Sequence, residues 1–307
     1  MTTTPAALPP ARQGRAWRIA VRIAIAVIVL LVLASGSVYG LSQRILFATH
    51  AVPEHTLSVR TDSATVARGA HLATIRGCVD CHAADFGGAM VIDDPAVGRI
   101  GGANLTAGRD GGVLADLDWE RAVRHGVRRD GTSLVLMPSA EFTGMSDEDL
   151  GAIVAYVRTL PVVNRAKLPV QLGPVLRTMA AAGQVKVAAD EIDHSRMHPQ
   201  SVAIAPTAEY GHYLAQGCTG CHGAHFSGGK IPGAPPDWKP AANITPAGIG
   251  RYTADDFARV LRTGARPDGS AVDTLMPWRL TKHMTDTEVA ALYAFLQTVP
   301  ARPYGQR

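Results

Sequence analysis

The chain has 307 residues, 47% of them hydrophobic and 18% charged, a composition typical of a globular protein and not of a disordered one. This length accommodates two domains of about 100–150 residues. The formal net charge is +4, and four arginines with no acidic residue lie among the first 22 residues, at positions 12, 15, 18 and 22, so the remainder is close to neutral and gives no support to a nucleic-acid partner.

A charge-free apolar segment of 19 residues runs from Ile23 to Leu41, after a Thr-, Pro- and Ala-rich stretch over residues 1–14 that is expected to be disordered. At about 1.5 Å per residue such a helix is long enough to cross a hydrocarbon core of about 30 Å. The preceding arginines place the N-terminus in the cytoplasm by the positive-inside rule. We therefore expect a cytoplasmic tail and single-pass membrane anchor over residues 1–48, with everything after it exported.

A cleaved signal peptide is the alternative interpretation of this segment. Its apolar core would be Ile23–Leu33, and the small residues Ala34-Ser35-Gly36 would form the cleavage site. Apolar residues continue beyond that site as far as Phe47, which favours a retained helix.

Two pentapeptides of the form C-x-x-C-H dominate the rest of the chain, Cys78–His82 and Cys218–His222. The two thiols lie one helical turn apart, where both can form thioether bonds to one haem, and the adjacent histidine supplies the proximal iron ligand. The sequence thus predicts two covalently attached c-type haems, held through Cys78, Cys81, Cys218 and Cys221, with His82 and His222 as iron ligands.

Other uses of C-x-x-C fit less well. A compact zinc site separates its cysteine pairs by about 15–20 residues, whereas 136 residues lie between Cys81 and Cys218. A thioredoxin-like motif requires a βαβ unit, and the flanking segments lack β-branched runs. All four cysteines belong to the two motifs, so none remains for a structural disulfide.

The two halves of the chain repeat one pattern around these motifs, which indicates a tandem duplication. The segments Ala103–Thr106 and Ala242–Thr245 match, as do the Leu-Met-Pro triplets ending at Pro138 and Pro277. We expect an all-α fold in which each half is a small haem-binding domain, at residues 60–162 and 207–302. A proline-containing linker over residues 163–206 joins them.

Three helices are expected in each half, the first ending in the haem motif. The second closes at a glycine suited to a helix C-terminus, Gly126 or Gly264. The last begins at Ser146 or Thr285, carries apolar residues at i, i+3, i+4 and i+7, and stops before a proline, at position 161 or 300.

Met137 and Met276 are the predicted sixth ligands, because both lie in Leu-Met-Pro, 55 and 54 residues after the proximal histidine. Methionine sulfur is a usual second axial ligand in electron-transfer haems. Met145 and Met284 also recur, but each immediately precedes a helix N-cap and fits a hydrophobic staple better.

The remaining polar candidates are weaker. His125 is expected to be an exposed helix-end residue, since Thr263 replaces it in the second half. Asn104, Thr106 and their counterparts Asn243 and Thr245 either bind haem propionates or close turns. Arg99 and Lys239 are equally open between propionate partners and ordinary surface charges, while Trp119 and Phe257 are expected in the core.

The second half, with its C-x-x-C-H motif, ANITPAGIG, LMP and MTDTEVAALYAFLQTVP, resembles class I cytochrome c domains in the membrane-bound cytochrome subunits of bacterial alcohol, gluconate and aldehyde dehydrogenases. The resemblance covers roughly residues 64–162 and 207–302. It departs in haem number, since those subunits typically carry three haem motifs, and in the N-terminal position of the apolar helix.

Taken together, the motifs and the resemblance predict a dihaem cytochrome c on the bacterial cytoplasmic membrane, with its haem domains on the periplasmic side. Such a protein transfers electrons between redox partners without a catalytic residue of its own. A dehydrogenase catalytic subunit is one partner that the resemblance implies. The open alternatives are a dihaem peroxidase-like enzyme with one open haem and a dedicated dehydrogenase subunit.

Overall fold

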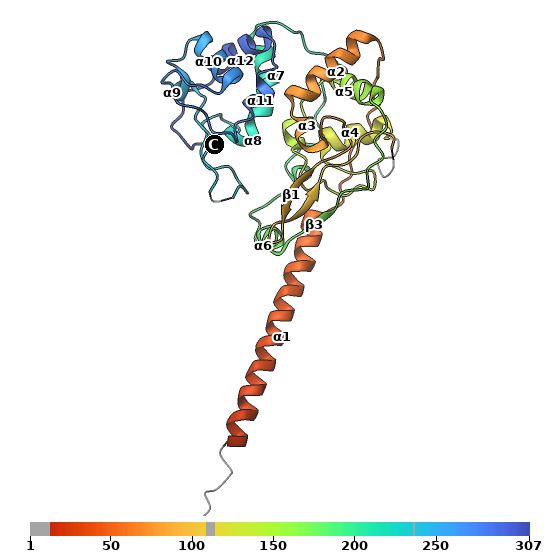
Figure 1. The fold of residues 1–307 in the computed structure, drawn as a ribbon, viewed down its shortest axis with the longest axis vertical. Helices are drawn as coiled ribbons and strands as arrows, with labels where there is room; N and C mark the ends of the chain where they lie inside the picture. The colour runs from red at the N-terminus through yellow and green to blue at the C-terminus, as the bar shows by residue number, and fades with distance from the viewer. Residues whose placement is uncertain (1–12, 109–113, 236) are drawn as a thin grey trace, which may run out of the picture.

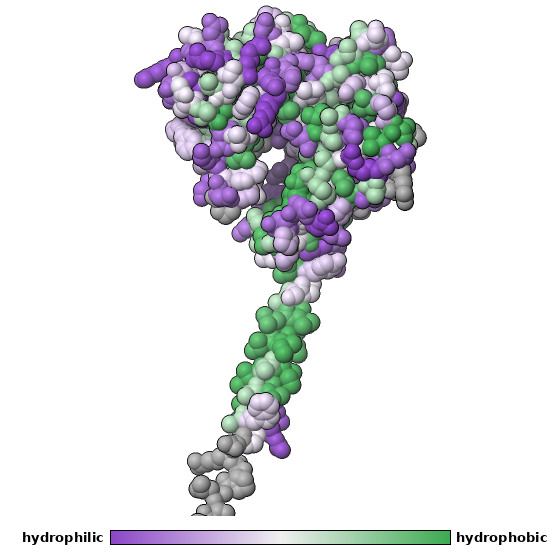
Figure 2. All heavy atoms as spheres, viewed as in Figure 1, coloured by the Kyte–Doolittle hydropathy of each residue, from purple (hydrophilic) through white to green (hydrophobic). Residues whose placement is uncertain are grey.

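The computed structural model describes residues 13–108, 114–235 and 237–307; the predicted N-terminal tail before residue 13 lies outside this range. Its most extended element is α1, Gln13–Leu46, which projects from a two-lobed head (Figure 1). The apolar side chains of α1 are exposed along most of its length, visible as the green stalk of Figure 2. By length and composition α1 is a candidate membrane span, and none of its most apolar window is buried.

The first repeat contains the helices that the sequence predicts. Helix α2, Ser63–Ile75, leads into α3, Cys78–His82, and the two others are α4, Asp116–His125, and α5, Asp147–Thr159. A short 3₁₀ helix, η1, Ser139–Glu141, follows the Leu-Met-Pro triplet.

The second repeat has the corresponding helices. They are α7, Ala208–Ala215; η3, Gln216–Cys218; α8, Thr219–His222; α9, Pro246–Ile249; α10, Ala254–Thr263; α11, Trp278–Thr281; and α12, Asp286–Thr298. Capping explains the boundaries. Ser146 and Thr285 accept hydrogen bonds from the third residue of α5 and α12, while Gly126 and Gly264 end α4 and α10 in the left-handed conformation.

The first and last helices of each repeat cross at very short range. A β-carbon added to Gly69 would lie 1.9 Å from the carbonyl oxygen of Ala152, and one added to Gly211 would lie 1.9 Å from that of Ala291. Glycine is therefore required on α2 and α7 for α5 and α12 to pack against them. Each haem motif follows the first of its two crossing helices, so the crossing positions the motif.

A three-stranded antiparallel sheet that was not predicted from the sequence joins two strands of the first repeat to one strand of the segment between the repeats. Strands β1, Met90–Asp94, and β2, Gly98–Gly101, form a hairpin, and β3, Val170–Leu172, pairs with the other edge of β2. Asp94 closes the hairpin turn by accepting hydrogen bonds from the backbone of Ala96 and Val97.

The segment between the repeats follows β3 with α6, Pro174–Ala181, and the 3₁₀ helix η2, Ala188–Asp190. Helix α6 packs on the C-terminal end of α1, where Arg177 donates a 3.0 Å hydrogen bond to the Ser42 hydroxyl. Val187 and Ala189 are buried in a small core with Leu46. Residues 163–206 therefore contact the first repeat and the head end of α1.

Candidate haem-binding sites

The first C-x-x-C-H motif forms α3, and the second runs from the end of η3 through α8; each presents its histidine in one defined tautomer. The Nδ1 atom of His82 lies 2.8 Å from the carbonyl oxygen of Ala103, and that of His222 lies 2.8 Å from the carbonyl oxygen of Ala242. Because a carbonyl can only accept, Nδ1 carries the hydrogen and Nε2 keeps its lone pair. A hydrogen bond of this kind, made by the ring nitrogen that does not bind the metal, orients metal-binding histidines.

The Ala-Asn-x-Thr segments that supply these carbonyls are closed by their own side chains. Asn104 Oδ1 accepts hydrogen bonds from the backbone and hydroxyl of Thr106, at 2.9 and 2.7 Å, and Asn243 does the same for Thr245. Both residue pairs thus close turns, one of the two roles that the sequence left open.

The Met-Pro sequence shapes the loop ahead of the last helix in the same way in both repeats. Pro138 (φ −81°, ψ 55°) and Pro277 (φ −79°, ψ 51°) are the central residues of inverse γ-turns. The residue after each proline donates to the carbonyl of Met137 or Met276, at 2.9 and 2.8 Å. Proline fits because its ring fixes φ near the required value.

In the first repeat the predicted ligands come together around one pocket. Cys78, His82 and Met137 line it, and apolar side chains form most of the remaining wall: Phe86, Leu105, Trp119, Val123, Phe142, Met145 and Ile153. A thioether-forming cysteine, a histidine with a free Nε2, a methionine and an apolar wall are the environment that a c-type haem needs.

Met145 lines the same pocket, yet it also occupies the staple position before Ser146 and is 4% exposed. The equivalent residues of the second repeat occupy corresponding places: Cys218 and Met276 pack against the main core, and His222 is 8% exposed. Trp119 and Phe257 are buried core residues, as predicted.

The comparison with known proteins agrees with this geometry. A family model described as cytochrome c matches residues 66–161 and again residues 208–300.

The chain belongs to the cytochrome c family.

Curated relatives extend the similarity over most of the chain. It is 30% identical over 281 residues to the cytochrome c subunit of a quinone alcohol dehydrogenase from Gluconacetobacter polyoxogenes, covering 80% of this chain and 58% of that protein. It is 28% identical to the gluconate 2-dehydrogenase cytochrome c subunit of Pantoea cypripedii, covering 80% of this chain and 62% of that subunit. A diheme cytochrome c-type protein of Cereibacter sphaeroides is 28% identical, covering 76% of this chain and 86% of that protein. The similarity to these subunits confirms the predicted resemblance. The chain spans about three fifths of the length of the two dehydrogenase subunits.

The thiols of this cytochrome c are poor thiolates in the folded chain. Burial raises the pKa of Cys78 to about 11 and that of Cys218 to about 12, and it raises the pKa of Cys81 and Cys221 as well. Zinc binding and disulfide exchange both need a thiolate. A raised thiol pKa therefore disfavours both alternative chemistries of C-x-x-C.

The prediction for His125 was wrong. Its ring is 2% exposed and lies between Glu120 and His194. Comparison with Thr263 could not predict this burial, because the segment between the repeats covers only the first repeat at this position. Arg99 and Lys239, in contrast, are surface residues paired with Asp93 and Asp273.

The two cytochrome c repeats meet through polar contacts that the sequence analysis missed. His71 Nε2 lies 2.9 Å from Glu288 Oε1, and the Tyr213 hydroxyl donates a 2.7 Å hydrogen bond to Asp149. Both pairs join a helix of one repeat to a helix of the other, which holds the two lobes of Figure 1 together. Single-sequence patterns carry no signal for such pairs, since 217 and 64 residues separate their partners.

The haem motifs themselves lie at this contact between repeats. A β-carbon on Gly77, before Cys78, would lie 3.2 Å from the Leu280 side chain, and one on Gly220, within the second motif, would lie 2.0 Å from Glu141 Oε1. Glu141 and Leu280 occupy the same position in the two repeats, four residues after the methionine of Leu-Met-Pro. The pairing therefore has approximate twofold symmetry.

Arg76 is the charged residue at the centre of this contact. It donates from Nη1 to the Leu214 carbonyl at 3.2 Å and lies over the Tyr213 ring, 5.2 Å from its centroid. Burial raises the pKa of Glu141 to about 7, an effect that the positive charge of Arg76 opposes. A titratable carboxyl and a fixed cation thus lie between the two haem-attachment helices.

Proposed function

We propose that this chain is a membrane-anchored dihaem cytochrome c that carries electrons between redox partners. The observation that supports it most is the repetition of one complete site: C-x-x-C-H, a histidine held through Nδ1, and a Met-Pro γ-turn before the last helix. Each haem, when bound, supplies one-electron iron chemistry. The chain's own residues attach it, orient it and exclude water.

The roles follow from this site in each repeat. Cys78 and Cys81 would attach the first haem, and His82 and Met137 would ligate its iron. In the second repeat the corresponding residues are Cys218, Cys221, His222 and Met276.

The proposal assigns a role to each part of the chain. Residues 1–48 form the tail and anchor, residues 60–162 and 207–302 the two haem domains, and residues 163–206 the connection between them. The motif contacts through Gly77 and Gly220 favour electron exchange between the two haems within one molecule.

The arrangement of charge supports membrane anchoring with the head on the periplasmic side. Arg15, Arg18 and Arg22 precede the apolar part of α1, and the head lies at the other end (Figure 2). Arginines on the N-terminal flank place that flank in the cytoplasm. The exported location also matches the compartment expected for c-type haem attachment.

A dehydrogenase catalytic subunit is the partner that the relatives suggest. Two of the relatives are cytochrome c subunits of alcohol and gluconate dehydrogenases, and the chain matches about three fifths of their length. A carrier that works without a dedicated catalytic chain is the second candidate; the relative from Cereibacter sphaeroides is named as a diheme cytochrome c-type protein and not as a dehydrogenase subunit. Co-purification of a catalytic polypeptide from native membranes distinguishes them.

The experiment that tests the electron-carrier function is a carbon monoxide difference spectrum of the reduced holoprotein. Carbon monoxide binds ferrous haem whose sixth position is open. We expect no binding at either haem, because a methionine holds each iron on its second side. Stoichiometric binding at one haem would instead favour a peroxidase-like enzyme and reject the methionine assignment in that repeat.

A further inference from the structure

Helix α4 has two functional faces, and only one belongs to the haem pocket. Trp119 and Val123 line that pocket, whereas Glu120, Arg124 and His125 point to the other side of the helix. All three of these side chains are at least 98% buried. Burying three ionisable groups is costly unless something compensates them.

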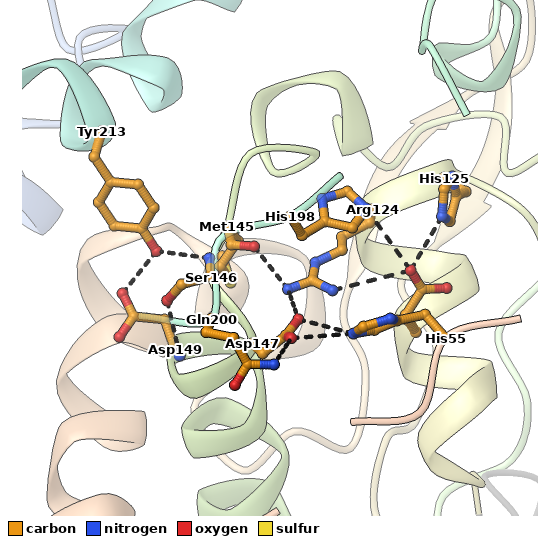
Figure 3. A network of polar contacts seen from close by, with 11 residues as sticks. His55, Arg124, His125, Met145, Ser146, Asp147, Asp149, His198, Gln200 and Tyr213 are labelled. Atoms are coloured by element: carbon orange, nitrogen blue, oxygen red, sulfur yellow. Dashed lines mark hydrogen bonds and ion pairs between the residues drawn. The ribbon is translucent and has the colours of Figure 1, made fainter. Parts of the chain in front are cut away.

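The cover over this face comes from the segment between the repeats. His194 Nδ1 lies 2.9 Å from His125 Nδ1, and the His198 side chain, 6% exposed, places Nε2 4.0 Å from Glu120 Oε1. In Figure 3 the side chains of His125, His198 and Arg124 converge from these separate elements.

The second repeat offers an internal comparison, because it lacks the whole cluster. Its residues at the positions of Glu120 and His125 are Ala258 and Thr263. Only the arginine recurs, as Arg262, whose partner Asp286 is 99% exposed. A haem domain of this type therefore folds without the cluster, and the cluster is an addition specific to the first repeat.

The buried cluster holds two carboxylates, Glu120 and Asp147, but one arginine. Arg124 donates from Nη2 to Asp147 Oδ1 at 2.7 Å, so these two charges match. Asp147 also contacts His55, 3.1 Å away, whose side chain is 39% exposed. Glu120 faces the His125 ring at 3.0 Å, the His198 ring at 4.0 Å and Arg124 Nη1 at 4.0 Å, and its Oε2 atom has no hydrogen-bond partner among the described residues.

The hydrogen bonds of the histidines can be followed from His194 to the contact between His125 and Glu120. His194 Nε2 must donate to the Ala189 carbonyl, 3.0 Å away, so its Nδ1 accepts from His125 Nδ1. His125 Nε2 then keeps a lone pair that points at Glu120 Oε1, 3.0 Å away. Two acceptors facing each other at this distance need a proton or a metal ion between or beside them.

We propose that Glu120, His125 and His198 bind a divalent transition-metal ion of the zinc class. Their ligand atoms all lie within 4.8 Å of one another. Two histidines and one glutamate are a known zinc donor set, and ligands of one zinc ion lie about 3.3 Å apart at ordinary bond lengths. The closest pair already lies within this distance, and an inward movement of the His198 ring by up to about 1.5 Å completes the set.

The surrounding residues supply the orientation that such a site requires. The chain from His125 through His194 to the Ala189 carbonyl fixes the tautomer of the first ligand. The metal would tie the segment between the repeats to α4, behind the first haem.

The test is zinc titration of the purified, chelator-treated holoprotein by isothermal calorimetry, with zinc content measured by mass spectrometry. We expect one zinc ion per chain and at least a tenfold loss of affinity in His198→Gln and in His125→Gln. His194→Gln should weaken binding by about tenfold through loss of orientation alone. His283→Gln, an exposed histidine of the second repeat, is the matched control and should bind as the wild type does.

Absence of a stoichiometric zinc ion would overturn the proposal. So would binding that His125→Gln and His198→Gln leave unchanged, since the ligands would then be surface histidines. His198 lies in a loop outside the helices, and haem absorbance reports whether each variant is folded. Glu120→Gln, which preserves side-chain shape, gives an independent loss of binding if a variant of either histidine does not fold.

Discussion

Replacing Glu141 with glutamine should make the folded protein more stable at neutral pH and leave it unchanged in acid. Glu141 is buried against the second haem motif, and this burial raises its pKa from about 4.5 to about 7. The folded protein therefore binds the proton more tightly than the unfolded chain does. The stabilisation that comes from this tighter proton binding is full below pH 4.5 and is lost as the pH rises through 7.

The magnitude follows from the size of this difference. A displacement of about 2.5 pKa units corresponds to about 3 kcal/mol at 1.36 kcal/mol per unit. The Glu141→Gln variant, which has no charge to desolvate, should match the wild type near pH 4.5. It should gain stability over the wild type by up to about 3 kcal/mol by pH 8, at a slope of at most about 1.4 kcal/mol per pH unit.

Urea denaturation of the holoprotein in detergent, followed at several pH values, measures this difference. Glu54→Gln is the matched control, because the Glu54 side chain is 76% exposed. It should differ from the wild type by the same small amount at every pH. A stability difference for Glu141→Gln that does not change between pH 4.5 and 8 would refute the reasoning.

Three further predictions follow from the sites and the helix packing. Met137→Ala and Met276→Ala should each let carbon monoxide bind one of the two haems, as the reduced difference spectrum reports; binding at neither haem in a variant means that another residue holds the iron. Gly211→Ala should destabilise the second repeat by about 3 kcal/mol in urea, because its new methyl group meets the backbone of the crossing helix. The control variant Gly36→Ala should keep its stability, because Gly36 has open space around it. Deleting residues 1–46 should move the holoprotein from the membrane to the soluble fraction on centrifugation, and continued sedimentation with membranes would point to a second attachment.

Much of the helical framework and the candidate haem site could be predicted from the sequence. Spacing in C-x-x-C-H, the Ser146 and Thr285 caps and the glycines that end α4 and α10 are local signals, since each acts within a few residues of backbone. The duplication strengthened these predictions, because a coincidental pattern would not recur at the same place in both halves. The sequence also placed Trp119 and Phe257 in the core by the same comparison.

The tertiary structure decided everything that depends on which segments meet. The sequence contained the alanine carbonyls that orient His82 and His222, but their function appears only when the loop folds back over the motif. Burial of His125 depends on a covering segment about 70 residues downstream, and the elevated pKa of Glu141 depends on contact with the other repeat. Local patterns determine the elements because their energies are local; desolvation and pairing between distant residues exist only after the chain has packed.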